Sequence, residues 1–252
     1  MSARGHAFGI DIGGSGVKGA AVDLATGELL HERIKIATPH PSTPHAVADA
    51  VAKLVAEADW PGPVGITLPS VVLEGVARTA ANIDKTWIGT DTRTLFSAAL
   101  GGRSVTVLND ADAAGLAEDR YGAARDFDGL VLLLTFGTGI GSALLYNGTL
   151  VPNTELGHLE VGGMETEHRA AASIKDREGL SYEQWAAEVS TVLIGLENLF
   201  WPKVIVAGGG ISRDSDQWIP LLTNRTPVVP ARLRNTAGIV GAAMAIASGV
   251  VP

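Results

Sequence analysis

The chain has 252 residues, of which 46% are apolar and 18% are charged, so it can bury a large core as one domain or as two smaller lobes. Its formal charge of −8 at pH 7 disfavours a nucleic-acid-binding protein, and the absence of cysteine excludes disulfides and thiolate metal sites. The apolar runs are too short to span a membrane and the first strand is expected to start too early for a signal peptide, which indicates a cytoplasmic protein without membrane contact.

The stretch 8–22 is predicted to form a strand, a tight glycine turn and a second strand. Glycine permits backbone conformations with φ > 0 and lets another group approach the backbone closely. Successive N–H groups of such a turn can bind an anion, with Ser15 adding a hydroxyl and Lys18 a cation. Asp11, at the end of the first strand, can hold a hydrated divalent cation beside the same anion. An ordinary glycine-rich hairpin is the alternative, because the stretch matches neither a Walker loop nor a dinucleotide fingerprint.

Turn signals and periodicity divide the following hundred or so residues into short elements. We expect strands at 29–37, 64–68 and 105–108, helices at 44–58, 92–100 and 111–121, a β excursion at 71–81 and a loop at 82–87. Asn109 and Asp110 lie between a strand and a helix, where open α/β sheets bind ligands. At such a junction Asp110 can take a proton from a substrate hydroxyl while Asn109 positions the substrate. Helix capping is the alternative, because Asn and Asp are preferred capping residues, and the two roles are compatible if Asn109 lies near the cap.

The second half repeats the opening pattern, which predicts two related halves. A strand at 130–136, a glycine turn at 137–141 and a strand at 142–146 come first, and another glycine turn at 208–210 follows a strand at 204–207. Each turn can bring backbone N–H groups onto a phosphate. The other elements are expected to be a loop with one polar helix at 148–180, helices at 182–200, 211–222 and 236–248, and a strand at 227–233. The apolar stripe from Tyr182 to Leu199 is favoured as core over a dimer interface.

Glu155 and His158 lie three residues apart in a loop that also contains glycine. A carboxylate that accepts hydrogen bonds and an imidazole that donates or accepts them suit the vicinal hydroxyls of a sugar. A metal site is the alternative, but the second histidine of a zincin helix is missing. The residues close in sequence that favour that alternative are Glu160, Glu165, Glu167 and His168. Asn82, in the loop before Trp87, is a further polar candidate.

Basic residues are concentrated near the end of this acidic chain. Residues 201–252 contain Lys203, Arg213, Arg225, Arg232 and Arg234 against only Asp214 and Asp216. A local basic surface suits a polyanionic small substrate, and scattered solvated charges are the alternative.

Taken together, these motifs occur in the order found in actin-like sugar kinases, and the chain resembles the ROK group of kinases and repressors from about residue 7 to 248. The motifs are Asp11–Lys18, Leu108–Asp110, Phe136–Gly141, Glu155-x-x-His158 and Ala207–Gly210. Within the group, the strings Val151–His158 and Glu167–Ala172 resemble those of bacterial glucokinases that use inorganic polyphosphate. The resemblance implies an α/β, actin-like (ribonuclease H-like) ATPase fold with a central cleft. Its lobes would be 1–109 plus 236–252 and 110–235.

The resemblance also implies a role for each motif. The expected reaction transfers a phosphoryl group from polyphosphate, and from ATP as well, to the 6-hydroxyl of glucose. Asp110 would be the general base, and Asp11 would bind Mg²⁺ through water. The other sugar hydroxyls would contact Asn82, Asn109, Glu155, His158 and Glu167, with Glu160 as the alternative to Glu167. The donor would contact Gly13, Gly14, Ser15, Lys18, Thr138, Gly139, Gly208, Gly209 and Gly210. Independently of the resemblance, the basic bias of residues 201–252 and the charge of polyphosphate lead us to expect that some of Lys18, Arg213, Arg232 and Arg234 line the exit from the donor site.

Two departures from the general ROK pattern narrow the expectation. The cysteine cluster that binds structural zinc in many members is missing, so no zinc is expected. The helix-turn-helix segment of the repressor branch is not expected either. A strictly ATP-dependent hexose kinase, a non-catalytic sugar sensor and an actin-like ATPase without a sugar substrate are the alternatives. We expect a homodimer.

Overall fold

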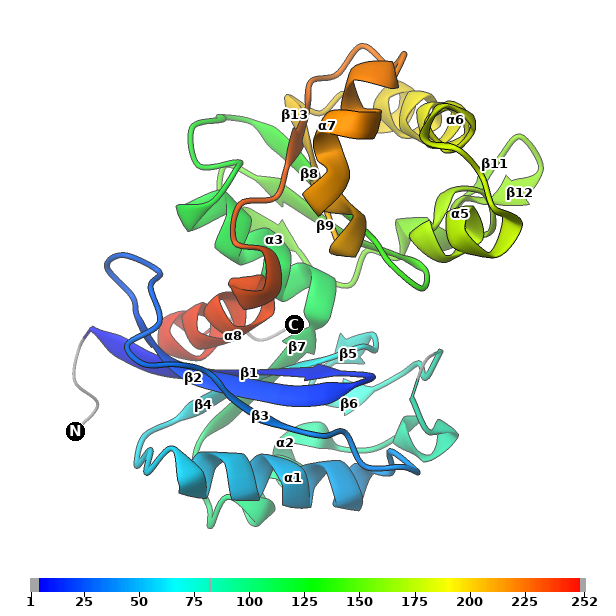
Figure 1. The fold of residues 1–252 in the computed structure, drawn as a ribbon. Helices are drawn as coiled ribbons and strands as arrows, with labels where there is room; N and C mark the ends of the chain where they lie inside the picture. Colours follow the sequence, from blue (N-terminus) through cyan, green and yellow to red (C-terminus); the bar gives the residue numbers. More distant parts are fainter. Residues whose placement is uncertain (1–4, 82, 250–252) are drawn as a thin grey trace. The chain divides into compact units, whose positions relative to one another are not determined.

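Two five-stranded sheets organise the chain, and each contains a hairpin closed by a glycine turn. They are seen in a computed structural model that describes residues 5–81 and 83–249 (Figure 1). Each sheet belongs to its own compact unit: residues 1–117 with 235–252 form the first unit, and residues 118–234 form the second. The predicted α/β class is confirmed, because both sheets are mixed and both are packed against helices.

The first sheet has the strand order β3-β2-β1-β4-β7. Strands β1 (His6–Gly13), β2 (Gly16–Asp23) and β3 (Ile34–Ile36) are antiparallel, whereas β4 (Val64–Leu68) and β7 (Val105–Asn109) run parallel to β1. Helices α1 (Pro44–Glu57) and α2 (Thr92–Ala99) cover one face, and α8 (Ala237–Ser248) covers the other (Figure 1). A small hairpin, β5 (Val72–Leu73) with β6 (Val76–Ala77), and a short 3-10 helix, Lys85–Trp87, complete the β excursion and its loop.

The second sheet repeats this plan with the order β10-β9-β8-β13-β14. Strands β8 (Leu130–Phe136), β9 (Ile140–Tyr146) and β10 (Thr149–Val151) are antiparallel, and β13 (Val204–Gly208) and β14 (Val228–Pro230) run parallel to β8. Strand for strand, β8, β9 and β10 correspond to β1, β2 and β3. The predicted repeat of two related halves is therefore confirmed by the topology.

Helix α6 (Tyr182–Phe200) supplies much of the second core. Ser181 caps it and exchanges hydrogen bonds with Gln184 in a capping box. Trp185 of this helix packs edge-on against Phe136 of β8 and against Trp218. The apolar stripe is core as predicted as far as Leu196, but Leu199 is 63% exposed, so its place in that stripe was wrong. None of the helices within 5–81 and 83–249 combines the length and apolar character that a membrane span requires.

Four predicted elements differ from the observed ones. The third strand is confined to Ile34–Ile36, because the charged residues before it are exposed and unpaired with β2. The region 148–180 is more regular than a loop: it holds β10, the hairpin β11 (Glu160–Val161) with β12 (Met164–Glu165), and helices α4 (Thr166–Ala170) and α5 (Ala172–Glu178).

The other two differences involve proline. The predicted helix 211–222 is broken into the 3-10 helix Gly210–Asp214, α7 (Ser215–Trp218) and the 3-10 helix Ile219–Leu221. Pro220, which cannot donate a helical hydrogen bond, accounts for the end of α7. The predicted strand 227–233 is shortened to Val228–Pro230, whose register partners on β13 are Ile205–Ala207, and Pro230 is tolerated because β14 is an edge strand. A last 3-10 helix, Arg234–Thr236, leads into α8.

Helix α8 approaches the first sheet so closely that two of its neighbours must be glycine. A Cβ atom added to Gly9 on β1 would lie 1.8 Å from the carbonyl oxygen of Ile239, and one added to Gly65 on β4 would lie 1.8 Å from that of Ala242. A similar contact joins α8 to α3 (Asp110–Tyr121), where a Cβ on Gly241 would lie 1.8 Å from the Ala113 carbonyl oxygen. The backbones are therefore in direct contact, and no rotamer change can make room.

We expect Gly9→Ala and Gly65→Ala each to lower the free energy of unfolding by at least about 1–3 kcal/mol, because the new methyl group must displace helix backbone. Chemical denaturation measures this change. Gly5→Ala is the control, since its Cβ would meet nothing within 4 Å. Equal stability of the control and the two buried variants would show that α8 does not depend on this close approach.

Candidate active site

Asp11 lies at the edge of the first sheet where its parallel strands end. In the sheet register, Asp11 on β1 faces Thr67 on β4, and Leu68 on β4 faces Asn109 on β7. The Asp11 carboxylate accepts a hydrogen bond from Thr67 Oγ1 at 3.1 Å, and its other oxygen lies 3.6 Å from Lys18 Nζ. Asp11 and Lys18 are about one-fifth exposed, 22% and 21%. An oriented carboxylate is thus accessible at the edge where open α/β sheets bind ligands.

Asn109 holds the junction between β7 and α3. Its Oδ1 accepts hydrogen bonds from the N–H groups of Ala111 at 2.8 Å and Asp112 at 3.2 Å, and its Nδ2 donates to the Ser70 carbonyl at 3.2 Å. This is helix capping, the alternative expected for this position. The side chain is 7% exposed and its amide is already hydrogen-bonded at both ends. Its contact with a sugar stays a prediction.

Asp110 is the first residue of α3 and is half-buried. Its Oδ1 accepts the Ala111 N–H at 2.9 Å, and the residue is engaged in a further interaction within the fold. The helix dipole favours a negative charge in this first turn. The junction therefore presents a carboxylate at the same sheet edge as Asp11, two strand spacings or about 10 Å across the sheet.

The first glycine turn leaves its backbone uncovered. Strands β1 and β2 stay paired as far as Gly13 and Gly16, so Gly14 and Ser15 alone form the tip. Gly13 and Gly14 are not among the residues with positive φ, and so the turn does not require a left-handed backbone there. A Cβ on Gly14 would meet nothing within 4 Å. The missing side chains instead leave open space in which another group can approach the N–H groups.

Two more glycine turns lie at neighbouring strand ends in the second unit. Thr138 and Gly139 follow β8, where the Gly137 N–H donates to the Gly139 carbonyl and Ser173 donates to the Thr138 carbonyl. Gly208 ends β13, the parallel neighbour of β8, and Gly209 and Gly210 follow it. Gly209 has φ = 84°, and a Cβ there would lie 2.2 Å from the carbonyl oxygen of Phe136. The third turn is therefore packed against the end of β8, the strand that leads into the second turn.

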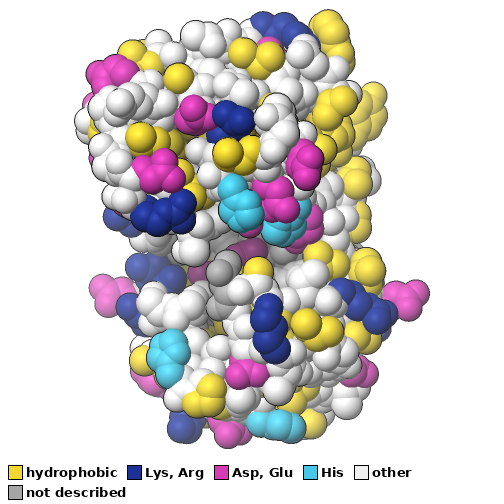
Figure 2. Space-filling model, turned by 90° about the vertical axis from the view of Figure 1, so that its right-hand side faces the viewer, with side chains coloured by type: hydrophobic (Ala, Val, Ile, Leu, Met, Phe, Trp, Pro, Cys, Tyr) yellow, Lys and Arg dark blue, Asp and Glu magenta, His cyan; other side chains and the backbone are white. Residues whose placement is uncertain are grey.

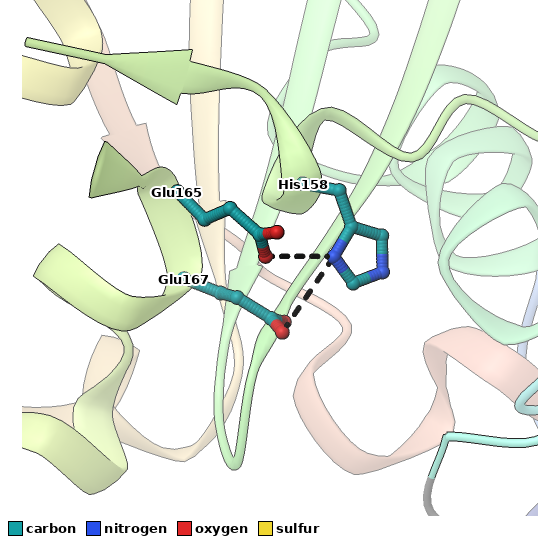
Figure 3. A group of neighbouring side chains, drawn as sticks. All are labelled: His158, Glu165 and Glu167. Atoms are coloured by element: carbon teal, nitrogen blue, oxygen red, sulfur yellow. Dashed lines mark hydrogen bonds and ion pairs between the residues drawn. The ribbon is translucent and has the colours of Figure 1, made fainter. Parts of the chain in front are cut away.

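His158 is surrounded by carboxylates in the second unit (Figure 3). Its Nδ1 lies 3.2 Å from Glu165 Oε2 and 3.7 Å from Glu167 Oε1. Glu165 and Glu167 also lie within 4.0 Å of His168. Histidine and acidic side chains accordingly adjoin one another on the surface shown in Figure 2. The sequence predicted Glu165 only as one of the residues that favour a metal site. Its contact with His158 could not be predicted, because the β11–β12 hairpin brings the two residues together.

Glu167 also reaches the second glycine turn. Its Oε2 accepts the Ile140 N–H at 3.4 Å, and a Cβ on Gly139 would lie 2.3 Å from that oxygen. The missing side chain of Gly139 thus provides the space that the carboxylate occupies. Glu167, which is predicted to bind the sugar, therefore contacts Gly139, which is predicted to bind the phosphate donor.

The carboxylates shift the ionisation of His158. The hydrogen bond with Glu165 raises the pKa of the imidazole, burial opposes this, and the charges of Glu167, Glu155 and Glu165 add to the rise. Loss of solvent around Glu155 raises the pKa of its carboxyl, with His158 opposing and Glu167 reinforcing the shift. Because the folded pKa of His158 is raised, its protonation stabilises the fold below the ordinary histidine pKa. That contribution is lost as pH rises through the raised value.

The predicted residues fall into two sets, one on each unit. The first unit carries Asp11, Gly13, Gly14, Ser15, Lys18, Asn109 and Asp110, and the second carries Thr138, Gly139, Glu155, His158, Glu167 and Gly208–Gly210. Asn82 lies outside the described residues. His158, Glu165 and Glu167 also offer ligand atoms within 4.8 Å of one another, which suits a divalent metal as well as a sugar.

Comparison with known proteins identifies the class. The sequence profile of the ROK family matches residues 7–171, and this chain belongs to that family. The chain is 63% identical over 240 residues to a polyphosphate glucokinase of Mycobacterium tuberculosis, covering 95% of this chain and 91% of that protein. The resemblance predicted from the ordered motifs is therefore confirmed.

Solved structures agree with this assignment. The inorganic polyphosphate/ATP-glucomannokinase of Arthrobacter sp. strain KM superposes with a TM-score of 0.92 at 50% identity, covering 98% of this chain and 100% of that one. A ROK family glucokinase from Streptomyces griseus, solved with glucose and AMPPNP, superposes with a TM-score of 0.82 at 25% identity, covering 97% and 100%. The predicted actin-like fold is confirmed by these neighbours.

We expect Glu165→Gln to lower the pKa of His158, because this substitution removes the carboxylate whose hydrogen bond contributes most to the raised value. An NMR titration that follows the His158 ring protons measures the pKa. Glu160→Gln is the matched control: Glu160 is paired with Glu165 across the same hairpin, but it has no ion pair with His158 among the described residues. An equal shift in both variants, or no shift in either, would contradict the assignment.

Proposed function

We propose that this protein transfers a phosphoryl group from inorganic polyphosphate, and also from ATP, to the 6-hydroxyl of glucose, giving glucose 6-phosphate. The observation that carries the proposal is the 63% identity, over 95% of the chain, to a protein named polyphosphate glucokinase. The likeness to a polyphosphate/ATP-glucomannokinase supports the use of both donors. Cytoplasmic residence and a homodimer stay predictions from the sequence.

In this proposal the acidic cluster binds the sugar. Glu155, His158 and Glu167 accept and donate hydrogen bonds to the hydroxyls that do not react, and Glu165 orients the imidazole. Glu167 is supported over Glu160 as the third acidic ligand. Its carboxylate lies 3.7 Å from His158 Nδ1, whereas Glu160 is exposed and is paired across the hairpin with Glu165.

Asp110 is the proposed general base. A sugar hydroxyl is a weak nucleophile, and a positioned carboxylate that takes its proton contributes roughly 10²–10⁴-fold in rate. The Asn109 cap fixes the first turn of α3, and with it the backbone that carries Asp110. The chemistry of phosphoryl transfer otherwise depends on positioning and charge stabilisation.

The glycine turns and Lys18 are proposed to hold the donor phosphates. Open N–H groups around Gly14 and Ser15 and the ammonium of Lys18 are suited to phosphate oxygens. Asp11 fits a hydrated Mg²⁺, because this ion is commonly held by one or two carboxylates, several waters and the substrate phosphates. When bound, the cation would neutralise charge on the phosphates, while Lys18 and Thr67 keep the Asp11 carboxylate oriented.

We expect Asp110→Asn to lower kcat by about 10²–10⁴-fold while glucose still binds, because the amide keeps the shape but cannot take the proton. Steady-state kinetics and calorimetric glucose binding measure the two effects. Asp119→Asn, on the same helix, is the control and should keep its turnover. Substantial turnover in Asp110→Asn would remove this residue from the role of base.

A donor comparison tests the reaction itself. Initial rates of glucose phosphorylation with long-chain polyphosphate and with ATP should both exceed background, and kcat/KM should be higher with polyphosphate. A higher kcat/KM with ATP at every polymer length would contradict the polyphosphate preference. Absence of glucose 6-phosphate with either donor would contradict the proposed function.

A further inference from the structure

A cavity of about 590 Å³ in the second unit is lined by Arg213, Arg232 and Arg234. Arg213 comes from the 3-10 helix that follows the third glycine turn, and Arg232 and Arg234 come from the segment after β14. The serines Ser212 and Ser215 and the apolar residues Phe127, Val229 and Pro230 complete much of the wall. Arginines about twenty positions apart in the sequence thus line the same cavity.

The three arginines give the lining of the cavity an excess of positively charged side chains. Within 5–81 and 83–249, none of the three arginine side chains has an ion pair or hydrogen bond to another residue. Of the described residues in the lining only Asp126 is acidic, and its Oδ1 lies 3.6 Å from Arg125 Nε. In a chain with a formal charge of −8, such a concentration of cations favours an anionic ligand.

A buried carboxylate fixes the walls of the cavity. Glu118 is 1% exposed and accepts hydrogen bonds from the N–H groups of Ala123 at 2.7 Å, Arg232 at 3.1 Å and Leu233 at 2.7 Å. A Cβ on Gly122 would lie 1.9 Å from this carboxylate, so the chain must be glycine there. The segments around residues 123 and 232 are therefore joined through one side chain, and the cavity is a preformed part of the unit.

The cavity adjoins the third glycine turn. Ser212, which lines it, donates a hydrogen bond from its hydroxyl to the Gly209 carbonyl at 2.8 Å. On the other wall, the Ala231 N–H donates to the Ala207 carbonyl at 2.9 Å. The third glycine turn and the cavity are therefore adjacent, within reach of one linear anion.

We propose that this cavity binds internal phosphates of a linear inorganic polyphosphate, beyond the phosphate that is transferred. The inference rests on the proposed function and adds a subsite to it. A polyphosphate chain carries roughly one charge per phosphate, and arginine forms two parallel hydrogen bonds to phosphate oxygens. The nucleoside of a nucleotide donor has no negative charge to match three arginines. Charge therefore favours a longer anion over the outer part of ATP.

The test replaces the arginines and measures donor length dependence. Arg213→Gln, Arg232→Gln and Arg234→Gln should each raise the KM for long-chain polyphosphate about two- to fivefold, and the triple variant on the order of tenfold or more. The ratio of the KM for long-chain polyphosphate to the KM for tripolyphosphate should also rise, and it should rise more in the triple variant than in the single variants. Arg177→Gln is the matched control, since Arg177 is exposed in the same unit and lies outside the cavity lining.

Calorimetric binding of long-chain polyphosphate, with thermal unfolding as a check of the fold, provides a second readout. The triple variant should bind more weakly than the wild type, and salt should reduce this difference because it screens exposed charges. Unchanged polyphosphate binding and KM in the triple variant would overturn the inference. So would an equal increase in the KM for ATP and for polyphosphate, which would assign the cavity to a nucleotide donor.

The kinetic and binding results also separate this inference from the proposed function. If the wild type phosphorylates glucose but the triple variant keeps its affinity for long chains, the subsite fails and the function stands. If the wild type leaves glucose unphosphorylated with every donor, the function fails, and the calorimetric comparison still decides whether the cavity binds polyphosphate.

Discussion

The direct contact between the backbone of α8 and the glycines of β1 and β4 is the constraint on which the first unit depends. Gly9 and Gly65 have no side chain between sheet and helix, so the helix lies against the sheet at backbone distance. The first turn of α8 then lies beside Asp11, where a Cβ on Gly238 would be 3.0 Å from the carboxylate. Gly241 extends the contact to α3, the helix that begins with Asp110. One packing arrangement therefore orients both carboxylates of this sheet edge.

In the second unit, acidic and basic side chains form two separate clusters, and a different ligand is proposed for each. Carboxylates gather around His158, where hydrogen-bond acceptors suit sugar hydroxyls, and arginines gather around the cavity next to Gly209, where cations suit phosphates. Glu167 links the first of these groups to the glycine turn after β8 through Ile140. Although the chain has a net negative charge, its acidic and basic side chains are concentrated on different surfaces of this unit, each complementary to one of the two proposed ligand classes.

Local sequence patterns predicted helices and strands correctly where the spacing of apolar residues matched only one type of element. Helix α6 and strand β4 begin and end as expected, because a strong apolar stripe or a short buried run bounded by turn residues leaves little choice. The prediction failed where pairing partners decide, as in the β11–β12 hairpin, or where a proline interrupts an otherwise periodic segment, as at Pro220. Hairpins of two residues per strand carry no period that could be read from the chain.

The sequence alone determined the family and the two glycine-turned halves, and it also supplied most of the residues that we propose for the chemistry, since these depend on motif identity and chain order. Only the tertiary structure decided that Asn109 is used in capping, that Glu165 joins His158, and that three arginines share one cavity. The physical reason is that each of these facts depends on contacts between separate elements: the Asn109 amide is held by the Ser70 carbonyl, His158 meets Glu165 through the β11–β12 hairpin, and Arg213 shares its cavity with Arg232 and Arg234. Such contacts are set by sheet register, by the Glu118 hydrogen bonds and by backbone contacts at glycine, and none of these is a property of a local stretch of chain.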